Sequence, residues 1–142
     1  MINLSKPAEV LLVEDNADDE LLALRAISKA GIACNVTVRR DGAQAIDRLL
    51  GETSPPHLVI LDYNLPRFSG LEVLKCLREQ SKTIHVPVVI FSGTNNVDDL
   101  FECYGHGANS CVAKPCDPKE YVECLSWITH YWLQLNQVAR SN

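Results

Sequence analysis

The chain has 142 residues, of which 46% are hydrophobic and 22% charged, as in a globular domain and unlike a disordered chain. Its formal net charge of −5 disfavours nucleic-acid binding, which rewards clustered lysine and arginine. No apolar run approaches the roughly 18 residues that a membrane helix needs, and residues 1–7 lack the charged-then-apolar order of a signal peptide. We therefore expect a cytoplasmic protein that binds neither nucleic acid nor membrane, with one domain at residues 9–138 and flexible ends at 1–8 and 139–142.

Five short apolar runs alternate along the chain with five longer amphipathic segments, and we interpret the runs as β-strands. They are Val10–Val13, Cys34–Val38, Leu58–Leu61, Val86–Phe91 and Ser110–Ala113. The first, third and fourth are continuously apolar, which is typical of strands that are buried on both faces of a parallel sheet.

Apolar residues recur at helical spacing between these runs. The expected apolar faces are Leu21, Leu24 and Ile27 or Ser28, then Ala43, Ile46 and Leu50, then Leu71, Leu74 and Leu77, then Val97, Leu100 and Phe101 after a cap at Asn95 or Asn96. A last helix begins at Asp117–Pro118, with the aspartate as N-cap. This order predicts an α/β fold in which a five-stranded parallel sheet carries helices on both faces and ends in an extended C-terminal helix.

The chain contains six cysteines, at positions 34, 76, 103, 111, 116 and 124. No CxxC motif occurs, and most of the cysteines lie inside apolar periodic segments. The pattern favours buried, reduced thiols over disulfides or a zinc site.

Polar residues follow four of the predicted strands at the point where each strand ends. They are Glu14 and Asp15 after the first, Asp62 after the third, Ser92 after the fourth and Lys114 after the fifth. Because ligands of parallel α/β sheets bind at the carboxyl ends of the strands, we expect these side chains to converge.

The converging set predicts a chemistry. Three carboxylates repel one another unless a cation lies among them, and hard oxygen ligands suit Mg²⁺. Asp62 is then placed as a nucleophile, while Lys114 and Ser92 can contact phosphate oxygens. Each residue alone has an ordinary alternative as a turn residue, a helix cap or a solvated charge, but their joint occurrence in this order favours a phosphoryl site.

The same residues carry a family resemblance. The chain resembles the receiver domain of bacterial response regulators through Leu11–Asn16, Leu58–Pro66, Gly70, Ser92 and Lys114–Pro115, over about residues 8–130. The resemblance implies a flavodoxin-like fold, phosphorylation of Asp62 by a sensor histidine kinase, and a switch hydroxyl at Ser92. It also implies Mg²⁺ held by Glu14, Asp15, Asp62 and the backbone carbonyl of Asn64, and a phosphate-binding Lys114 that precedes a cis bond to Pro115.

Two positions depart from the family pattern. The acidic pair is Glu14–Asp15 where Asp–Asp is commoner, and the longer glutamate should still reach the metal directly or through water. The aromatic switch residue expected three positions before the lysine is Cys111, so the output face is expected to differ from the usual one.

The last helix carries two adjacent apolar stripes. One comprises Tyr121, Leu125, Ile128 and Trp132, and the other comprises Cys124, Trp127, Tyr131 and Val138. One stripe should cover the sheet. The second is either buried by an unusually deep helix or forms a homodimer contact, and its tryptophan and tyrosine favour the dimer.

A narrower resemblance is to the single-domain regulators paired with bacterial and cyanobacterial phytochrome kinases. It rests on Asp117–Tyr121, Trp127, Tyr131–Leu133, Asp15–Asp19 and Asn64–Arg67. It implies a phytochrome-type kinase as phosphodonor and a dimer through the last helix. The cysteines show no pattern of a chromophore site.

Two rival functions stay open. A haloacid-dehalogenase-type phosphatase also uses a strand-end aspartate, but Asn64 stands where that class has its general acid, and an amide cannot serve as one. A pseudo-receiver would be a scaffold that never takes up phosphate, which the complete Asp62 and Lys114 set disfavours. A DNA-binding module would need at least ~50 further residues, so we expect a stand-alone regulator that is not an enzyme and acts through protein contacts.

Overall fold

The computed structural model of the protein describes residues 6–51, 53–93 and 96–137. Strands and helices alternate along this part of the chain. In order they are β1 (Ala8–Val13), α1 (Ala17–Lys29), β2 (Cys34–Arg39), α2 (Gly42–Leu50), β3 (Leu58–Leu61), α3 (Gly70–Glu79), β4 (Val88–Ser92), α4 (Val97–Gly105), β5 (Ser110–Ala113), α5 (Pro118–His130) and the π-helical segment η1 (Tyr131–Leu135).

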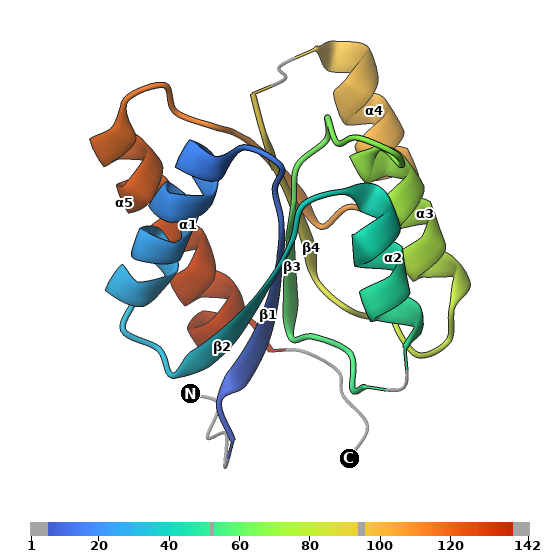
Figure 1. The fold of residues 1–142 in the computed structure, drawn as a ribbon, viewed down its shortest axis with the longest axis horizontal. Coiled ribbons are helices and arrows are strands. Elements are labelled where there is room, and N and C mark those ends of the chain that lie inside the picture. Colours follow the sequence, from blue (N-terminus) through green and yellow to red (C-terminus); the bar gives the residue numbers. More distant parts are fainter. Residues whose placement is uncertain (1–5, 52, 94–95, 138–142) are drawn as a thin grey trace.

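The five strands form one parallel sheet in the order β2-β1-β3-β4-β5. Helices α1 and α5 cover one face of the sheet, and α2, α3 and α4 cover the other (Figure 1). The predicted α/β fold is confirmed, including the continuation of the last helix through η1.

The core has two layers because the central strands are buried on both faces. Leu12 of β1 and Ile60 of β3 pack toward α1 and α5, whereas their neighbours Leu11 and Val59 pack toward α2 and α3. Alternate side chains of a strand point to opposite faces, so a strand covered on both sides must be apolar throughout. This explains the continuous apolar runs in the sequence.

The buried faces of two helices differ from the expected ones. In α1, Leu21 is 66% exposed, and the buried residues are Ala23, Ala26 and Ile27. In α2, Leu50 is 53% exposed, and the buried residues are Gly42, Ala45 and Leu49. In each helix two of the three buried residues are alanine or glycine, and apolar periodicity gives such small residues little weight.

Helix α4 has the predicted N-cap, but most of its predicted apolar face is not buried. The Asn96 side chain accepts hydrogen bonds from the backbone amides of Asp98 and Asp99, so Asn96 is the N-cap. Val97 and Phe101 are 62% and 74% exposed, and Cys103 is the buried residue of this helix. An apolar face therefore remains uncovered on α4.

Helix α5 begins as predicted, with Asp117 accepting a hydrogen bond from the amide of Glu120 and with proline in the first turn. Its inner stripe packs against the sheet through Tyr121 and Leu125. Trp127 and Tyr131 of the second stripe are 67% and 47% exposed, whereas Val138 lies outside the described residues.

Three smaller expectations concern the ends, the cysteines and a proline. The flexible ends expected at 1–8 and 139–142 fall mostly outside the described residues, and β1 starts at Ala8. All six cysteines are free, but only Cys103 is buried and Cys116 is exposed, so the expectation of buried thiols was too broad. The cis bond expected before Pro115 is wrong: peptide bonds in the described part of the chain are trans, the form that X–Pro bonds favour intrinsically.

None of the helices in the described ranges combines the length and the apolar character needed to cross a membrane.

Candidate functional site

The predicted site residues meet at the carboxyl edge of the sheet because each one continues a strand. Backbone hydrogen bonds extend the ladder past the strand ends: the amide of Asp62 donates to the Val13 carbonyl at 3.1 Å, and the amide of Lys114 donates to the Ser92 carbonyl at 2.9 Å. These bonds fix the backbone beneath each functional side chain.

Lys114 connects three carboxylates of the site. Its ammonium donates to Asp62 Oδ2 at 2.8 Å, to Glu14 Oε1 at 2.5 Å and to Asp19 Oδ2 at 2.9 Å. The lysine side chain is only 11% exposed. Burial alone would lower the pKa of Lys114, but the hydrogen bonds that its ammonium donates to Asp62, Glu14 and Asp19 raise that pKa above its usual value. The lysine is therefore charged throughout the physiological range.

The Asp62 carboxylate is held from three sides. Its Oδ1 atom accepts a hydrogen bond from the Ser92 hydroxyl at 2.8 Å and another from the backbone amide of Asn64 at 3.1 Å, while Oδ2 accepts from Lys114. Asp62 is 8% exposed.

Glu14, Asp15 and Asp62 form a group that fits a divalent cation. Carboxylate oxygens of the three residues lie within 4.8 Å of one another. Burial, together with the nearby charge of Asp62, raises the pKa of Glu14 to about 7, although the hydrogen bond from Lys114 opposes the rise. The site thus holds more negative charge than one lysine neutralises. Oxygen donors in this number suit Mg²⁺.

A close packing of α3 against the loop after β3 positions Asp62. The amide of Gly70 donates to the Tyr63 carbonyl at 2.9 Å. A Cβ atom on Gly70 would lie 2.2 Å from the backbone oxygen of Asp62, so this position excludes any side chain. Gly70 belongs to the motif that carried the family resemblance, and this contact is its physical role.

Sequence reasoning missed two residues of the site. Asp19 in the first turn of α1 contacts Lys114, and the hydroxyl of Tyr121 in α5 donates to the Asp19 backbone carbonyl at 3.2 Å. Both contacts join segments about a hundred positions apart, which no local pattern reveals. A local signal was that Asp19 stands three residues after the N-cap Asn16, in the first turn of the helix that follows the acidic pair.

Cys111, which stands where an aromatic switch residue was expected, contacts helix α4. The amide of Cys111 in β5 donates to the hydroxyl of Tyr104 in α4 at 3.1 Å. Tyr63, next to Asp62, donates a hydrogen bond from its hydroxyl to Asp99 in α4 at 3.3 Å. Helix α4 is thus tied both to β5 and to the loop that bears Asp62.

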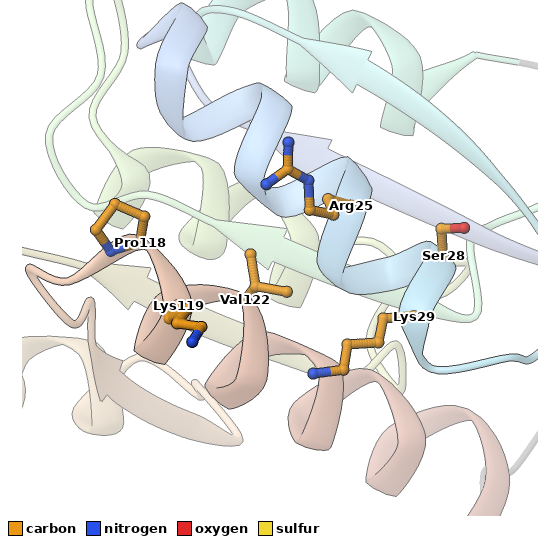
Figure 2. A pocket seen from close by; sticks show the side chains of 6 residues that line it. All are labelled: Arg25, Ser28, Lys29, Pro118, Lys119 and Val122. Atoms are coloured by element: carbon orange, nitrogen blue, oxygen red, sulfur yellow. The ribbon is translucent and has the colours of Figure 1, made fainter.

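A separate shallow groove of about 530 Å³ lies between α1 and α5. Figure 2 shows its lining residues, which are Arg25, Ser28 and Lys29 on α1 and Pro118, Lys119 and Val122 on α5. Three of the six are cationic, although the whole chain has a net charge of −5. None of them belongs to the set around Asp62.

Comparison with known proteins agrees with this geometry. The family model described as the response regulator receiver domain matches residues 10–126. The chain is 32% identical over 141 residues to the probable methanogenesis regulatory protein FilR2 of Methanothrix harundinacea, covering 96% of this chain and 91% of that protein. It is 31% identical to response regulator Rcp1 of Synechocystis, covering 90% of each protein.

Solved structures give the same result. The phosphorylated cyanobacterial phytochrome response regulator RcpA superposes with a TM-score of 0.88 at 30% identity, covering 94% of this chain and 99% of that one. The Mn²⁺-bound form of response regulator Rcp1 superposes with a TM-score of 0.85 at 29% identity, covering 94% of this chain and 100% of that one.

Proposed function

Because the chain belongs to the response regulator receiver family, we propose that it is a single-domain response regulator that accepts a phosphoryl group on Asp62. The observation that carries the proposal is the environment of the Asp62 carboxylate, to which Lys114 and Ser92 each donate a hydrogen bond. Both donors are placed to turn from the carboxylate to phosphoryl oxygens attached to it. Phosphoryl transfer needs positioning and charge stabilisation more than covalent help from the protein.

The donor in this proposal is a phosphohistidine of a sensor histidine kinase. A carboxylate oxygen of Asp62 forms a bond to phosphorus, and the bond from phosphorus to the imidazole nitrogen breaks with its electron pair left on that nitrogen. The Lys114 ammonium stabilises the negative charge on the phosphoryl oxygens during the transfer, and the Ser92 hydroxyl donates a hydrogen bond to one of these oxygens. Mg²⁺, when bound by Glu14, Asp15, Asp62 and the Asn64 carbonyl, neutralises charge on the phosphoryl oxygens.

The expected kinase is of the phytochrome type. Supporting this, one of the similar solved structures is a phosphorylated cyanobacterial phytochrome response regulator that matches nearly the full length of both chains. The proposal places the protein in the cytoplasm and assigns it no nucleic acid or membrane as partner. In this proposal the protein acts through contacts with other proteins and not through catalysis. The alternative is a phosphatase, which would hydrolyse a small phosphoester. We expect the protein to show no such turnover.

The second stripe of α5 supports a homodimer. Trp127 and Tyr131 are large and exposed, and the half-buried Cys124 lies about one turn before Trp127 and two turns before Tyr131. Aromatic residues of this kind are enriched at protein interfaces. Trp127→Ala should therefore weaken self-association in light scattering, whereas Leu21→Ala, which removes an equally exposed side chain from α1, should not. A monomer in the unmutated protein would rule out the dimer.

Phosphoryl acceptance is tested with acetyl phosphate and Mg²⁺. The unmutated protein should gain one phosphoryl group by intact mass, Asp62→Asn should gain none, and Asp47→Asn, which removes an exposed carboxylate from α2, should behave as the unmutated protein. Labelling that survives in Asp62→Asn would disprove the assignment. A folded protein that is never labelled would instead support the pseudo-receiver alternative.

A further inference from the structure

Asp19 lies in the candidate site without a role in the chemistry described above. Its carboxylate is 2.9 Å from the Lys114 ammonium and is 30% exposed. Among the described residues, the acidic group that fits a cation comprises Glu14, Asp15 and Asp62, and Asp19 is not part of it. Within the described ranges, the hydrogen bond to Lys114 is the contact that this carboxylate makes.

The backbone of Asp19 is held at the start of α1 by contacts on both sides. The amide of Asp19 donates to the side-chain oxygen of Asn16 at 2.9 Å, which is the N-cap contact of the helix. On the other side, the Asp19 carbonyl accepts from the Tyr121 hydroxyl at 3.2 Å. A contact from each side holds the residue in place, unlike an acidic residue that merely favours a helix N-terminus. Asp18, its neighbour, is exposed and serves as the comparison.

A lysine ammonium has three N–H donors, and here three carboxylates accept from them. A phosphoryl group on Asp62 would need at least one of these donors. Glu14 and Asp62 can turn to a bound cation when the site is loaded, because their carboxylates belong to the acidic group. Asp19 has no such second partner and keeps its hold on Lys114.

We propose that Asp19 is a positioning residue that competes with the phosphoryl oxygens for Lys114, and thereby slows phosphoryl uptake and shortens the life of the phosphorylated state. This inference rests on the proposed function. It involves an exchange of hydrogen-bond acceptors and no covalent step. Removal of the Asp19 charge should free the lysine for the phosphoryl group.

The first test measures binding of beryllofluoride, an acyl-phosphate analogue, by calorimetry in Mg²⁺, together with the rate at which the acetyl phosphate label is lost. Asp19→Asn should bind beryllofluoride about threefold more tightly and lose the label about threefold more slowly, an effect limited by partial exposure. Asp19→Ala should change both quantities in the same direction. Asp18→Asn, which removes the same charge one residue away, should match the unmutated protein.

The second test needs no phosphorylation. Urea unfolding in EDTA of Asp19→Asn, Lys114→Met and the double variant should show that the two side chains are energetically coupled. No coupling, equal effects of Asp18→Asn and Asp19→Asn, or weaker beryllofluoride binding in Asp19→Asn would each overturn the inference. Absence of labelling in every variant, with the coupling intact, would instead indicate failure of the proposed function.

Discussion

Two partly buried cations organise the two ends of this sheet in different ways. Lys114, at the carboxyl edge, is bound by three carboxylates. Arg78 of α3 lies at the opposite edge and donates to neutral oxygens, which are the carbonyls of Thr83, Ile84, Val86 and Gly107 and the side chain of Asn109. It thereby ties the segment before β4 to the segment before β5.

The difference shows which end of the molecule can change state. The oxygens that Arg78 binds lie outside the candidate site, so its contacts are not exchanged when a cation or a phosphoryl group binds there. Carboxylates gain or lose partners when a cation or a phosphoryl group arrives, so the contacts of Lys114 can be rearranged. We expect the effects of substitutions at the Lys114 edge to change when Mg²⁺ or a phosphoryl group is bound. Substitutions at the Arg78 edge should change the free energy of unfolding by the same amount in every condition.

The largest expected effect is that of Lys114→Met. It leaves Glu14 and Asp62 buried without their counter-ion, which should lower the free energy of unfolding by about 3 kcal/mol in EDTA. Mg²⁺ should restore part of that loss because it supplies positive charge to the same oxygens. Urea unfolding with and without Mg²⁺ measures both quantities. A loss that is equal in the two conditions would break the contrast with Arg78.

Arg78→Ala should be next in size. It leaves several backbone carbonyls without a donor and should cost roughly 3 kcal/mol of stability, or slightly less if water reaches them. The loss should be the same with and without Mg²⁺, and the folded protein should still accept phosphate from acetyl phosphate. Lys75→Ala, an exposed change in the same helix, should alter stability by less than about 0.5 kcal/mol.

Gly70→Ala should have the smallest effect on stability, about 2 kcal/mol, because the loop after β3 must shift away from the new Cβ atom. The shift moves Asp62, so the rate of labelling by acetyl phosphate should also fall. Gly105→Ala is the control, since a Cβ at that helical position meets no atom within 4 Å. An unchanged labelling rate in Gly70→Ala would show that the loop does not set the position of Asp62.

The sheet was predictable from the sequence because burial on both faces leaves a continuous apolar run. The continuously apolar run at Leu58–Leu61 matches β3 at both ends, and the mixed run at Ser110–Ala113 matches the less buried edge strand β5 at both ends. The residues after the strands were predictable as neighbours for a related reason, since parallel strands end at a common edge. What the site residues do chemically remains a proposal.

The remaining features depend on contacts that a local pattern does not encode. Gly42 is buried in α2 because the backbone of Phe68 leaves no room for a side chain, and a search for apolar residues passes over it. Phe101 fits a helical apolar face, but no described element covers that face. Asp19 was missed because its partner Lys114 is ninety-five positions away.

The loosely wound segment η1 has a geometric consequence for the end of the molecule. Residues four apart on an α-helix drift around its axis by about 40° per step, so a long row of them spirals away from a flat surface. The wider turn of η1, in which the Asn136 amide donates to the Tyr131 carbonyl, offsets that drift. Trp127, Tyr131 and Leu135, all exposed, therefore form a nearly straight ridge, whose whole length a planar surface could touch at once.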